Sequence, residues 1–388
     1  MVNKFVGTTY DSNGRLPVAI VGGGPTGMAL ALALSRYGIQ VEIFDARSRE
    51  EHRKEKRVLA LSYGSRQILE WLGVWNNIDT TPITTIHVSQ QGGFGRTRIT
   101  AAAEGLDALG YVTPATSLIS ALDTEVQQAG LICREHTRVE NVDVKGVVVN
   151  LRTTGGNCEA ALVAYAEGSV GEGAGIRARN YGQHAVTCIA TIDAPHDNQA
   201  WERFTAYGPV ALLPYGEQLA VVFTCPSNAV NAIAALDDAA FVEQLQQQFG
   251  QRLRFVSVGP RNVFPLGLRY RHSTVGPRQV WLGNAAQTLH PVAGQGFNLA
   301  LRDIRQLARS LAEATDAGNA TVLARHAQSR RRDRRATISA TDTLVRLFSN
   351  DNPLLRHVRG AGLLALDLIP PARSFLARRM MFGARAWP

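Results

Sequence analysis

Three glycines near the start of the chain, spaced as Gly22-x-Gly24-x-x-Gly27, constrain its fold more than any other feature. An apolar run at residues 16–21 precedes them, and small and apolar residues at helical spacing follow over residues 28–37. In this context the first glycine makes a tight turn, the second lets a pyrophosphate approach the backbone, and the third lets the helix pack closely on the strand. The pattern therefore predicts a dinucleotide-binding βαβ unit.

Asp45 supports this prediction. It ends the next apolar run, residues 40–45, about where a carboxylate accepts a hydrogen bond from a ribose hydroxyl. The pyrophosphate would lie at the N-terminus of the helix, where unpaired N–H groups and the helix dipole favour an anion. We predict that Gly22, Gly24, Gly27 and Asp45 bind the ADP half of a dinucleotide.

A second glycine-rich segment, residues 283–298, has a similar character. It follows a predicted strand, passes through His290 and Pro291, and carries Gly294 and Gly296 just before a long helical pattern. A helix start of this kind stabilises negative charge on a bound ring. Two such helix starts about 270 residues apart imply one long ligand that spans both. FAD fits this requirement, with its isoalloxazine ring at the second segment.

The composition excludes several classes of protein. With 45% hydrophobic and 19% charged residues among 388, the chain can bury one large or two medium cores, which excludes a disordered chain or a small scaffold. Every apolar stretch is interrupted well short of the roughly 18 residues that a membrane span needs, and residues 1–15 lack the apolar segment of a secretory signal. The four cysteines form no Cys-x-x-Cys pair, and no His/Cys cluster predicts a metal site. We expect a cytoplasmic protein with reduced thiols.

The order of predicted elements indicates an α/β protein in which a Rossmann-like first domain is interrupted by a mostly β second domain. Short alternating runs dominate the middle of the chain, and helical patterns dominate its end. The expected divisions are a flexible arm at 1–15, the first domain at 16–75, 101–180 and 270–320, the second at 76–100 and 181–269, and a helical C-terminal region at 321–388.

The net charge of +9 lies entirely in the last 88 residues. Residues 301–388 hold 16 arginines, no lysine and 7 acidic residues, whereas the preceding 300 hold 25 charges of each sign. Such a basic block can contact anionic lipid, an acidic partner or nucleic acid, and a solvated helix face is the alternative. We expect a peripheral membrane contact, or a contact with an acidic partner, through Arg330, Arg331, Arg332, Arg334 and Arg335, and no nucleic-acid partner.

Several segments resemble the FAD-dependent aromatic hydroxylases of ubiquinone biosynthesis, and most of all the branch that hydroxylates 2-polyprenyl-6-methoxyphenol. The resemblance runs from about residue 16 to the C-terminus, and its most specific part is the run Gly-Asn-Ala-Ala-Gln-Thr-Leu-His-Pro-Val-Ala-Gly-Gln-Gly-Phe-Asn-Leu. The segments that carry it are Gly22 to Gly27 with Asp45, Arg57-Val-Leu-Ala-Leu, Gly283 to Asp303, and Thr341 to Ser349.

This resemblance implies a fold like that of p-hydroxybenzoate hydroxylase and a set of further FAD-binding residues. Arg57 is expected near the flavin, and Asn284 stands where related hydroxylases often have an Asp that binds the ribityl chain. Glu167 stands in Ala166-Glu167-Gly168, where the wider family has Ala-Asp-Gly, so its longer side chain can impair FAD or nicotinamide handling. The residues expected around the flavin ring are Gly294, Gln295, Gly296, Phe297 and Asn298.

The resemblance also implies a reaction. NAD(P)H, bound transiently, reduces FAD, and one oxygen atom of O2 is added to the aromatic ring of a polyprenylated phenol. His290 and Pro291 are the candidate catalytic residues beside the flavin, and a structural hydrogen bond is the alternative role of His290. Two other functions remain open: a flavin hydroxylase or reductase of another aromatic or isoprenoid substrate, and a non-catalytic scaffold subunit of a ubiquinone-biosynthesis assembly. Glu167 and the changed segment Thr113–Thr116 suggest the scaffold.

Overall fold

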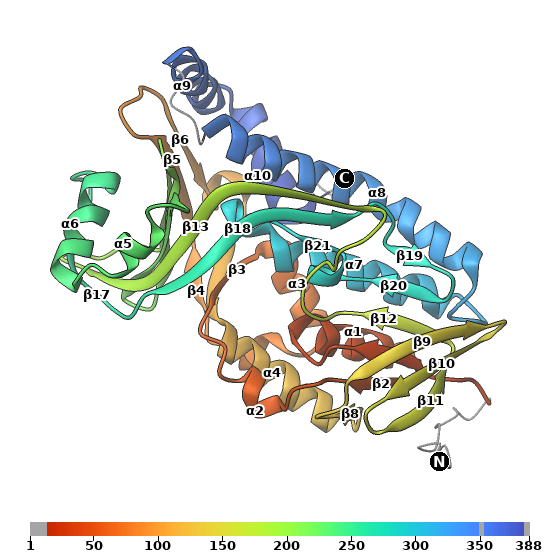
Figure 1. Cartoon of the computed structure of the whole chain (residues 1–388). Coiled ribbons are helices and arrows are strands. Elements are labelled where there is room, and N and C mark those ends of the chain that lie inside the picture. Colours follow the sequence, from red (N-terminus) through yellow and green to blue (C-terminus); the bar gives the residue numbers. More distant parts are fainter. Residues whose placement is uncertain (1–13, 349–352, 384–388) are drawn as a thin grey trace.

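The structure is a computed structural model that describes residues 14–348 and 353–383. Figure 1 shows an N-terminal sheet with its helices at one end, a second, larger sheet at the other, and the C-terminal helices lying along both. The N-terminal sheet has six strands. Their order is β19 (Val275–Gly276), β20 (Gln279–Trp281), β12 (Leu162–Tyr165), β1 (Val18–Val21), β2 (Val41–Phe44) and β8 (Ile132–Arg134).

Strands β20 to β8 of this sheet are all parallel, and β1 and β2 are buried along their whole length. Parallel strands covered on both faces read as continuous apolar runs, which is why the sequence located them. One face carries α1 (Pro25–Ser35), α4 (Ala115–Gln128) and α7 (Gln295–Ala312). A small sheet covers the other face, made of β9 (Val139–Lys145), β10 (Val148–Thr153) and β11 (Gly156–Ala160).

The second sheet is mostly antiparallel. Its strands, in order, are β21 (Gln287–Thr288), β18 (Asn262–Arg271), β13 (Ile176–Ile192), β16 (Gln218–Pro226), β15 (Gly208–Tyr215), β14 (Gln199–Thr205), β5 (Thr85–Gln90) and β6 (Arg96–Thr100), and β17 (Phe255–Val258) pairs with β13. Two helices, α5 (Val230–Ala234) and α6 (Asp238–Phe249), cover the face that we call outer. Successive side chains of a strand point to opposite faces. Trp201 packs among the outer-face residues, whereas Phe204 packs on Val292 and lies on the inner face.

The inner face is closed by a third layer that belongs to the N-terminal half of the chain. Val112 packs with Ala200 of β14, so the two layers share a core. The layer consists of β3 (Val58–Ser62), β7 (Gly110–Pro114) and β4 (Thr81–Ile83), with α2 (Arg49–His52), α3 (Tyr63–Trp71) and the 3-10 turns η1 (Trp75–Asn77) and η2 (Ala102–Glu104).

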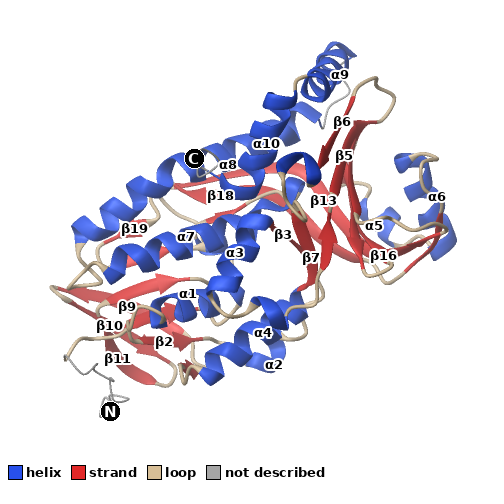
Figure 2. Ribbon diagram, turned by 180° about the vertical axis from the view of Figure 1, so that it is seen from behind, coloured by secondary structure: helices blue, strands red, loops and turns tan. Residues whose placement is uncertain are grey.

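Three helices end the described chain: α8 (Ala320–Phe348), α9 (Pro353–Leu368) and α10 (Pro370–Phe382). Figure 2 shows α8 running alongside α7, and α9 beside the loop between β5 and β6. The predicted breaks at Pro353 and at Pro370 are confirmed, because α9 and α10 begin there. No helix in the described ranges combines the length and the hydropathy that a membrane span requires.

Two of the arginines of α8 do not lie where the sequence analysis predicts. Arg330 and Arg334 are buried, and their guanidinium groups donate to Asp303 (2.5 Å) and to Gln287 (2.6 Å). The prediction that they take part in an exposed basic surface is therefore wrong, because their phase on the helix turns them toward α7 and β21. Their neighbours Arg331 and Arg332 are exposed.

Candidate functional site

The three fingerprint glycines have different neighbours in the structure. Gly22 has a φ of 110°, and a Cβ atom added to it would lie 2.7 Å from Cβ of Glu167. A Cβ on Gly27 would lie 1.8 Å from the carbonyl oxygen of Gly22, so this position allows only glycine. A Cβ on Gly24 would meet nothing closer than 3.7 Å, at the ring of His52. The turn and the close helix packing thus account for Gly22 and Gly27. The protein itself does not require glycine at position 24, where a Cβ would make only ordinary van der Waals contact with His52, so a ligand is the remaining reason for a glycine there.

The first turn of α1 is suited to an anion. Gly24 is the N-cap, Pro25 follows it, and no side chain caps the helix. The first N–H groups of a helix have no partner within the helix, and an uncapped start leaves them to a ligand. The pyrophosphate that the fingerprint predicts would meet both these donors and the positive end of the helix dipole here.

Asp45 lies directly behind this turn. Its Oδ2 atom accepts from the N–H of Gly23 (2.5 Å) and lies 2.8 Å from Nε2 of His52, while Oδ1 accepts from the N–H of Arg47 (2.7 Å). Burial raises the pKa of Asp45, but these hydrogen bonds outweigh it and hold the pKa below its ordinary value. A carboxylate accepts about four hydrogen bonds, so room remains for one ribose hydroxyl. Sequence analysis did not find His52, which lies seven residues from Asp45 in a polar run with no motif.

Glu167 lies beside the same turn, because β12 ends next to β1 in the sheet. Partial burial and the nearby carboxylate of Asp45 raise the pKa of Glu167, and Arg138 and Arg47 oppose them. When ionised, this carboxyl group adds negative charge beside a turn where a pyrophosphate would need positive charge. The predicted impairment of FAD or nicotinamide handling remains a prediction.

The second glycine-rich segment meets the first at Gly283, which begins the 3-10 turn η3 (Gly283–Ala285). Gly283 has a φ of 55°, and a Cβ on it would lie 2.8 Å from Oγ1 of Thr26 in the first turn of α1. Asn284 follows with an exposed side chain. Residues far apart in sequence thus form one site, and Asn284 stands beside the turn where the ADP half is expected.

The start of α7 forms the other end of this site. The 3-10 turn η4 (Val292–Gly294) leads into it, and the N-cap Gly294 has a φ of 59°. A Cβ on Gly294 would lie 3.0 Å from Cβ of Ala60 in β3, whereas Gly296 has no heavy atom within 4 Å. Gln295 is buried and donates to the carbonyl oxygen of Met380 in α10 (3.3 Å).

Asn298 holds this loop against β3 and α3. Its Oδ1 atom accepts from the N–H of Ser62 (2.8 Å) and from Oγ of Ser65 (2.6 Å). Its Nδ2 atom donates to the carbonyl oxygens of Ala60 (2.9 Å) and Gly294 (2.7 Å). These four bonds use the carboxamide fully, so Asn298 shapes the backbone that would face the flavin.

Two further predicted residues border the loop. Phe297 is half-buried against the core between α7 and the N-terminal sheet. Arg57 precedes β3 with an exposed side chain, and its Nη2 atom donates to Glu55 (2.9 Å). Since β3 carries Ala60, which touches Gly294, Arg57 lies directly before the strand that borders the predicted flavin end.

His290 is buried just before η4. Its Nδ1 atom accepts from the N–H of Val292 (3.1 Å), so the ring carries its proton on Nε2, and Nε2 has no hydrogen-bond partner among the described residues. Burial lowers the pKa of His290 to about 4. The ring is therefore neutral at physiological pH and offers one unused N–H donor. Pro291 is the N-cap of η4 and fixes the turn that follows.

Glu202 is a candidate that sequence analysis missed. It lies on β14 between Ala200 and Phe204, and by strand alternation it shares their inner face, toward β7 and η4. Its Oε1 atom is buried without a hydrogen-bond partner in the described part of the chain, and burial raises the pKa of Glu202 to about 7. The sequence gives no signal for it, because Glu202 stands beside Arg203 in a polar pair and the pattern does not show that both faces of β14 are covered.

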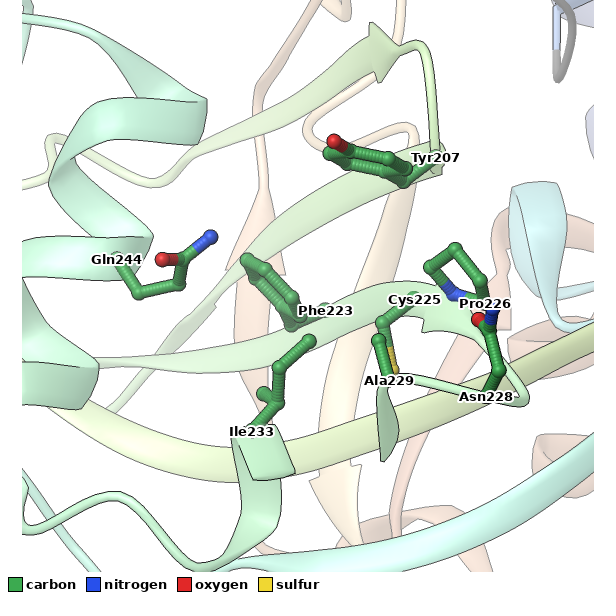
Figure 3. A pocket seen from close by; sticks show the side chains of 8 residues that line it. All are labelled: Tyr207, Phe223, Cys225, Pro226, Asn228, Ala229, Ile233 and Gln244. Carbon is green, nitrogen blue, oxygen red and sulfur yellow. The ribbon is translucent and has the colours of Figure 1, made fainter. Parts of the chain in front are cut away.

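A pocket of about 370 Å³ lies elsewhere, between β16 and the helices α5 and α6 (Figure 3). Its lining has no charged side chain, and Phe223 and Cys225 in its wall belong to the outer-face core. It shares no residue with the two glycine-rich segments. The residues that line it are Tyr207, Phe223, Cys225, Pro226, Asn228, Ala229, Ile233 and Gln244.

Comparisons with known proteins agree with this geometry. Residues 15–341 match the family described as FAD binding domain. Ubiquinone hydroxylase UbiL of Rhodospirillum rubrum is 33% identical over 390 residues, covering 96% of this chain and 90% of that protein. The 3-demethoxyubiquinol 3-hydroxylase of Escherichia coli is 29% identical over 391 residues, covering 92% and 96%.

The fold is shared with solved structures. Klebsiella pneumoniae HpxO, solved as a variant in complex with FAD, matches with a TM-score of 0.75 at 17% identity, covering 95% of this chain and 99% of that one. The predicted architecture, like that of p-hydroxybenzoate hydroxylase, is thereby confirmed. Helix starts without side-chain caps, open space at Gly296, a position at Gly24 where the protein does not itself require glycine, and a buried carboxylate behind the first turn fit FAD. The chain belongs to the FAD-binding-domain family of flavin-dependent aromatic hydroxylases.

Proposed function

We propose that this protein hydroxylates the aromatic ring of a polyprenylated phenol in ubiquinone biosynthesis, using FAD, NAD(P)H and O2. The observation that carries the proposal is the contact of Gly283 with Thr26, which joins two glycine-rich helix starts into one long site. The names of the relatives, a ubiquinone hydroxylase and a 3-demethoxyubiquinol 3-hydroxylase, support the substrate class.

Different residues of the site would bind different parts of FAD. The N-terminus of α1 at Gly24 would bind the pyrophosphate, Asp45 the ribose, Asn284 the ribityl side, and the N-terminus of α7 would balance negative charge on the ring. When bound, FAD supplies the electron transfer and oxygen activation that amino-acid side chains cannot provide.

The protein must also orient the phenol. Glu202 is a titratable group on the inner face with an unused oxygen, and its pKa of about 7 suits a group that accepts the proton of a phenol hydroxyl. His290 offers a neutral N–H donor next to η4. We propose that Glu202 holds the phenol hydroxyl and that His290 donates to a polar atom at the flavin end.

The test uses the purified protein with bound FAD. The expected result is NAD(P)H oxidation that increases with a short-chain prenylated phenol and gives a product carrying labelled oxygen from O2. Gly24→Val should lose FAD and this activity. Gly171→Val serves as the matched control, because Gly171 is exposed, has no heavy atom within 4 Å of an added Cβ, and lies outside both glycine-rich segments. Labelled product only from non-prenylated phenols would favour the other hydroxylase function. Absence of bound flavin together with tight binding to a partner protein would favour the scaffold.

A polyprenylated phenol partitions into the membrane, so the protein must meet it at the bilayer or receive it from a partner. The predicted cluster of arginines on α8 does not supply this contact as a whole, because Arg330 and Arg334 are buried. A membrane contact through another surface is part of the proposal.

A further inference from the structure

One end of the molecule exposes an unusual number of large apolar side chains. Figures 1 and 2 both show α9 beside the loop between β5 and β6 at this end. Leu368 is 69% exposed and Phe94, in the loop, is 52% exposed. We call this surface the apolar tip, and it consists of Phe94, Val358, Leu364, Leu368 and Ile369, all of them exposed.

Helix α9 has the reverse of the usual polarity of a surface helix. Its charged Arg359 is buried and donates to the carbonyl oxygens of Leu347 (3.1 Å) and Phe348 (3.2 Å). No charged residue lies on the exposed face between 358 and 366, where the spacing of three and four is that of one helix face. The residues exposed on that face are Val358, Ala361, Gly362, Leu364, Ala365 and Leu368. A water-facing helix normally shows the opposite arrangement.

The loop and the helix pack closely against each other. A Cβ on Gly95 would lie 2.1 Å from the carbonyl oxygen of Gly360, and a Cβ on Gly360 would lie 2.5 Å from that of Phe94. Two glycines therefore let the backbones touch. Oδ1 of Asp367 also accepts from the N–H of Arg98 (3.2 Å). The exposed residues of the loop and of α9 therefore belong to one continuous surface.

A basic pocket of about 470 Å³ adjoins the apolar tip, and Leu364 lines it. Arg96, Arg203 and Arg252 also line it, and none of them forms an ion pair with the residues that the structure describes. Asp367 is the single carboxylate among its lining residues, which are His87, Ser89, Gln90, Gly92, Gly93, Gly95, Arg96, Arg203, Arg252, Leu364 and Asp367.

His87 adds a buried donor to this pocket. It is 7% exposed, and its Nε2 atom accepts from Nη1 of Arg252 (2.5 Å). Its proton therefore lies on Nδ1, which has no hydrogen-bond partner among the described residues. Three arginines and an unused donor form the kind of site that takes a phosphate group.

We propose that this surface docks on an anionic phospholipid bilayer, with the apolar tip at the boundary between headgroups and acyl chains and a lipid phosphate in the basic pocket. Apolar side chains next to unpaired arginines are the combination that binds such an interface. The reason for the contact rests on the proposed function, because the substrate is membrane-bound. Leu363 of α9 packs in one apolar cluster with Phe204 and Val292, so the docked helix also contacts the turn beside His290.

The test is co-sedimentation of the full-length, FAD-loaded protein with vesicles of phosphatidylglycerol and phosphatidylcholine, compared with phosphatidylcholine alone. The wild type should prefer the anionic vesicles, and high salt should weaken the binding. Arg96→Gln and Arg252→Gln should each weaken it about five-fold. Phe94→Ser with Leu368→Asn should weaken it at least about ten-fold on both kinds of vesicle.

Matched controls keep the result specific. Val147→Ser removes another exposed apolar side chain and Arg332→Gln another exposed arginine, and neither should change binding. Bound-flavin absorbance and thermal midpoints equal to the wild type show that each variant is folded. The proposal fails if the wild type does not bind at low salt, if the tip and pocket variants bind as it does, or if the controls weaken binding equally.

Two further measurements distinguish membrane docking from a site for a free anion and from the proposed catalytic function. Protection of the fold by inorganic phosphate, lost in Arg252→Gln, without vesicle binding would identify a site for a free anion and overturn membrane docking. Turnover of a short-chain prenylated phenol without vesicles tests the proposed function separately, and the tip variants should retain it. Vesicle binding without turnover would therefore contradict the proposed function and leave docking supported.

Discussion

Arg330 donates from Nε to Oδ1 of Asp303 at 2.5 Å, and both side chains are buried between α7 and α8. Its Nη2 atom donates to Oδ2 of Asp333 (2.5 Å), which also accepts from Nε of Arg302 (2.8 Å). Burial raises the pKa of Asp333, but the attraction of the two arginines outweighs it and holds the pKa below its ordinary value. These charges therefore join α8 to α7, the helix that begins in the second glycine-rich segment.

We predict that Arg330→Gln destabilises the protein by about 3–5 kcal/mol, because removing one partner leaves a buried carboxylate uncompensated. Arg332→Gln, two residues away and exposed, should stay within about 0.5 kcal/mol of the wild type. Urea unfolding at neutral pH measures both. Equal unfolding midpoints for the two variants would mean that the buried network contributes no stability.

The fingerprint glycines allow a matched pair of variants. A methyl group on Gly27 would collide with the carbonyl oxygen of Gly22, so Gly27→Ala should lower the free energy of unfolding by about 1–3 kcal/mol even without FAD. Gly24→Ala meets no protein atom within 3.4 Å and should leave the flavin-free protein as stable as the wild type. It should weaken FAD binding by about ten-fold or more, because the methyl group occupies the approach to the phosphate. Thermal unfolding and FAD titration separate the two effects, and a Gly24→Ala protein with unchanged FAD affinity would contradict the assigned role.

Apolar runs and helical spacing in the sequence predicted those strands and helices that are determined by residues close together in the chain. The runs at 16–21 and 40–45 became β1 and β2, and the helical pattern after Gly294 became α7. Strand β13 shows the limit. The sequence indicated a strand from Ala185, but the strand begins at Ile176, because its exposed first half pairs with β18 and carries no apolar alternation.

The sequence predicted those site residues whose identity is fixed by the local backbone conformation, and it missed those whose role depends on tertiary contacts. Glycine spacing pointed to the turns at Gly22 and Gly294, whose positive φ angles few other residues adopt. The burial of Arg330 beside exposed Arg331 depends on where Asp303 lies on another helix, and composition cannot report that. Glu202 was not predicted either, because its pKa depends on residues of other strands that cover it.

Asp45 should make stability depend on pH in the acid range. Its pKa in the folded protein lies below the ordinary 3.8, so its contribution is fully present above that value and is lost as the pH falls through the folded pKa. Asp45→Asn should therefore cost about 1.5–3 kcal/mol at pH 7, the range for hydrogen bonds to a charged group, and less at pH 3. Urea unfolding of both proteins at the two pH values tests this. A difference that stays constant would show that the charge of Asp45 is not responsible.

Glu202 should make stability depend on pH in the opposite direction to Asp45. Burial raises its pKa from 4.5 to about 7, so its contribution is fully present below about pH 4.5 and is lost as the pH rises through 7. Glu202→Gln keeps the shape without the charge. It should match the wild type near pH 4.5 and exceed its stability at pH 8 by on the order of 1–3 kcal/mol. The exposed Glu217→Gln should show no such trend.

If Glu202 holds the phenol proton, the pH profile of kcat/KM should also lose a step near pH 7 in Glu202→Gln and keep it in the control. A stability difference without a changed profile would confine Glu202 to a structural role.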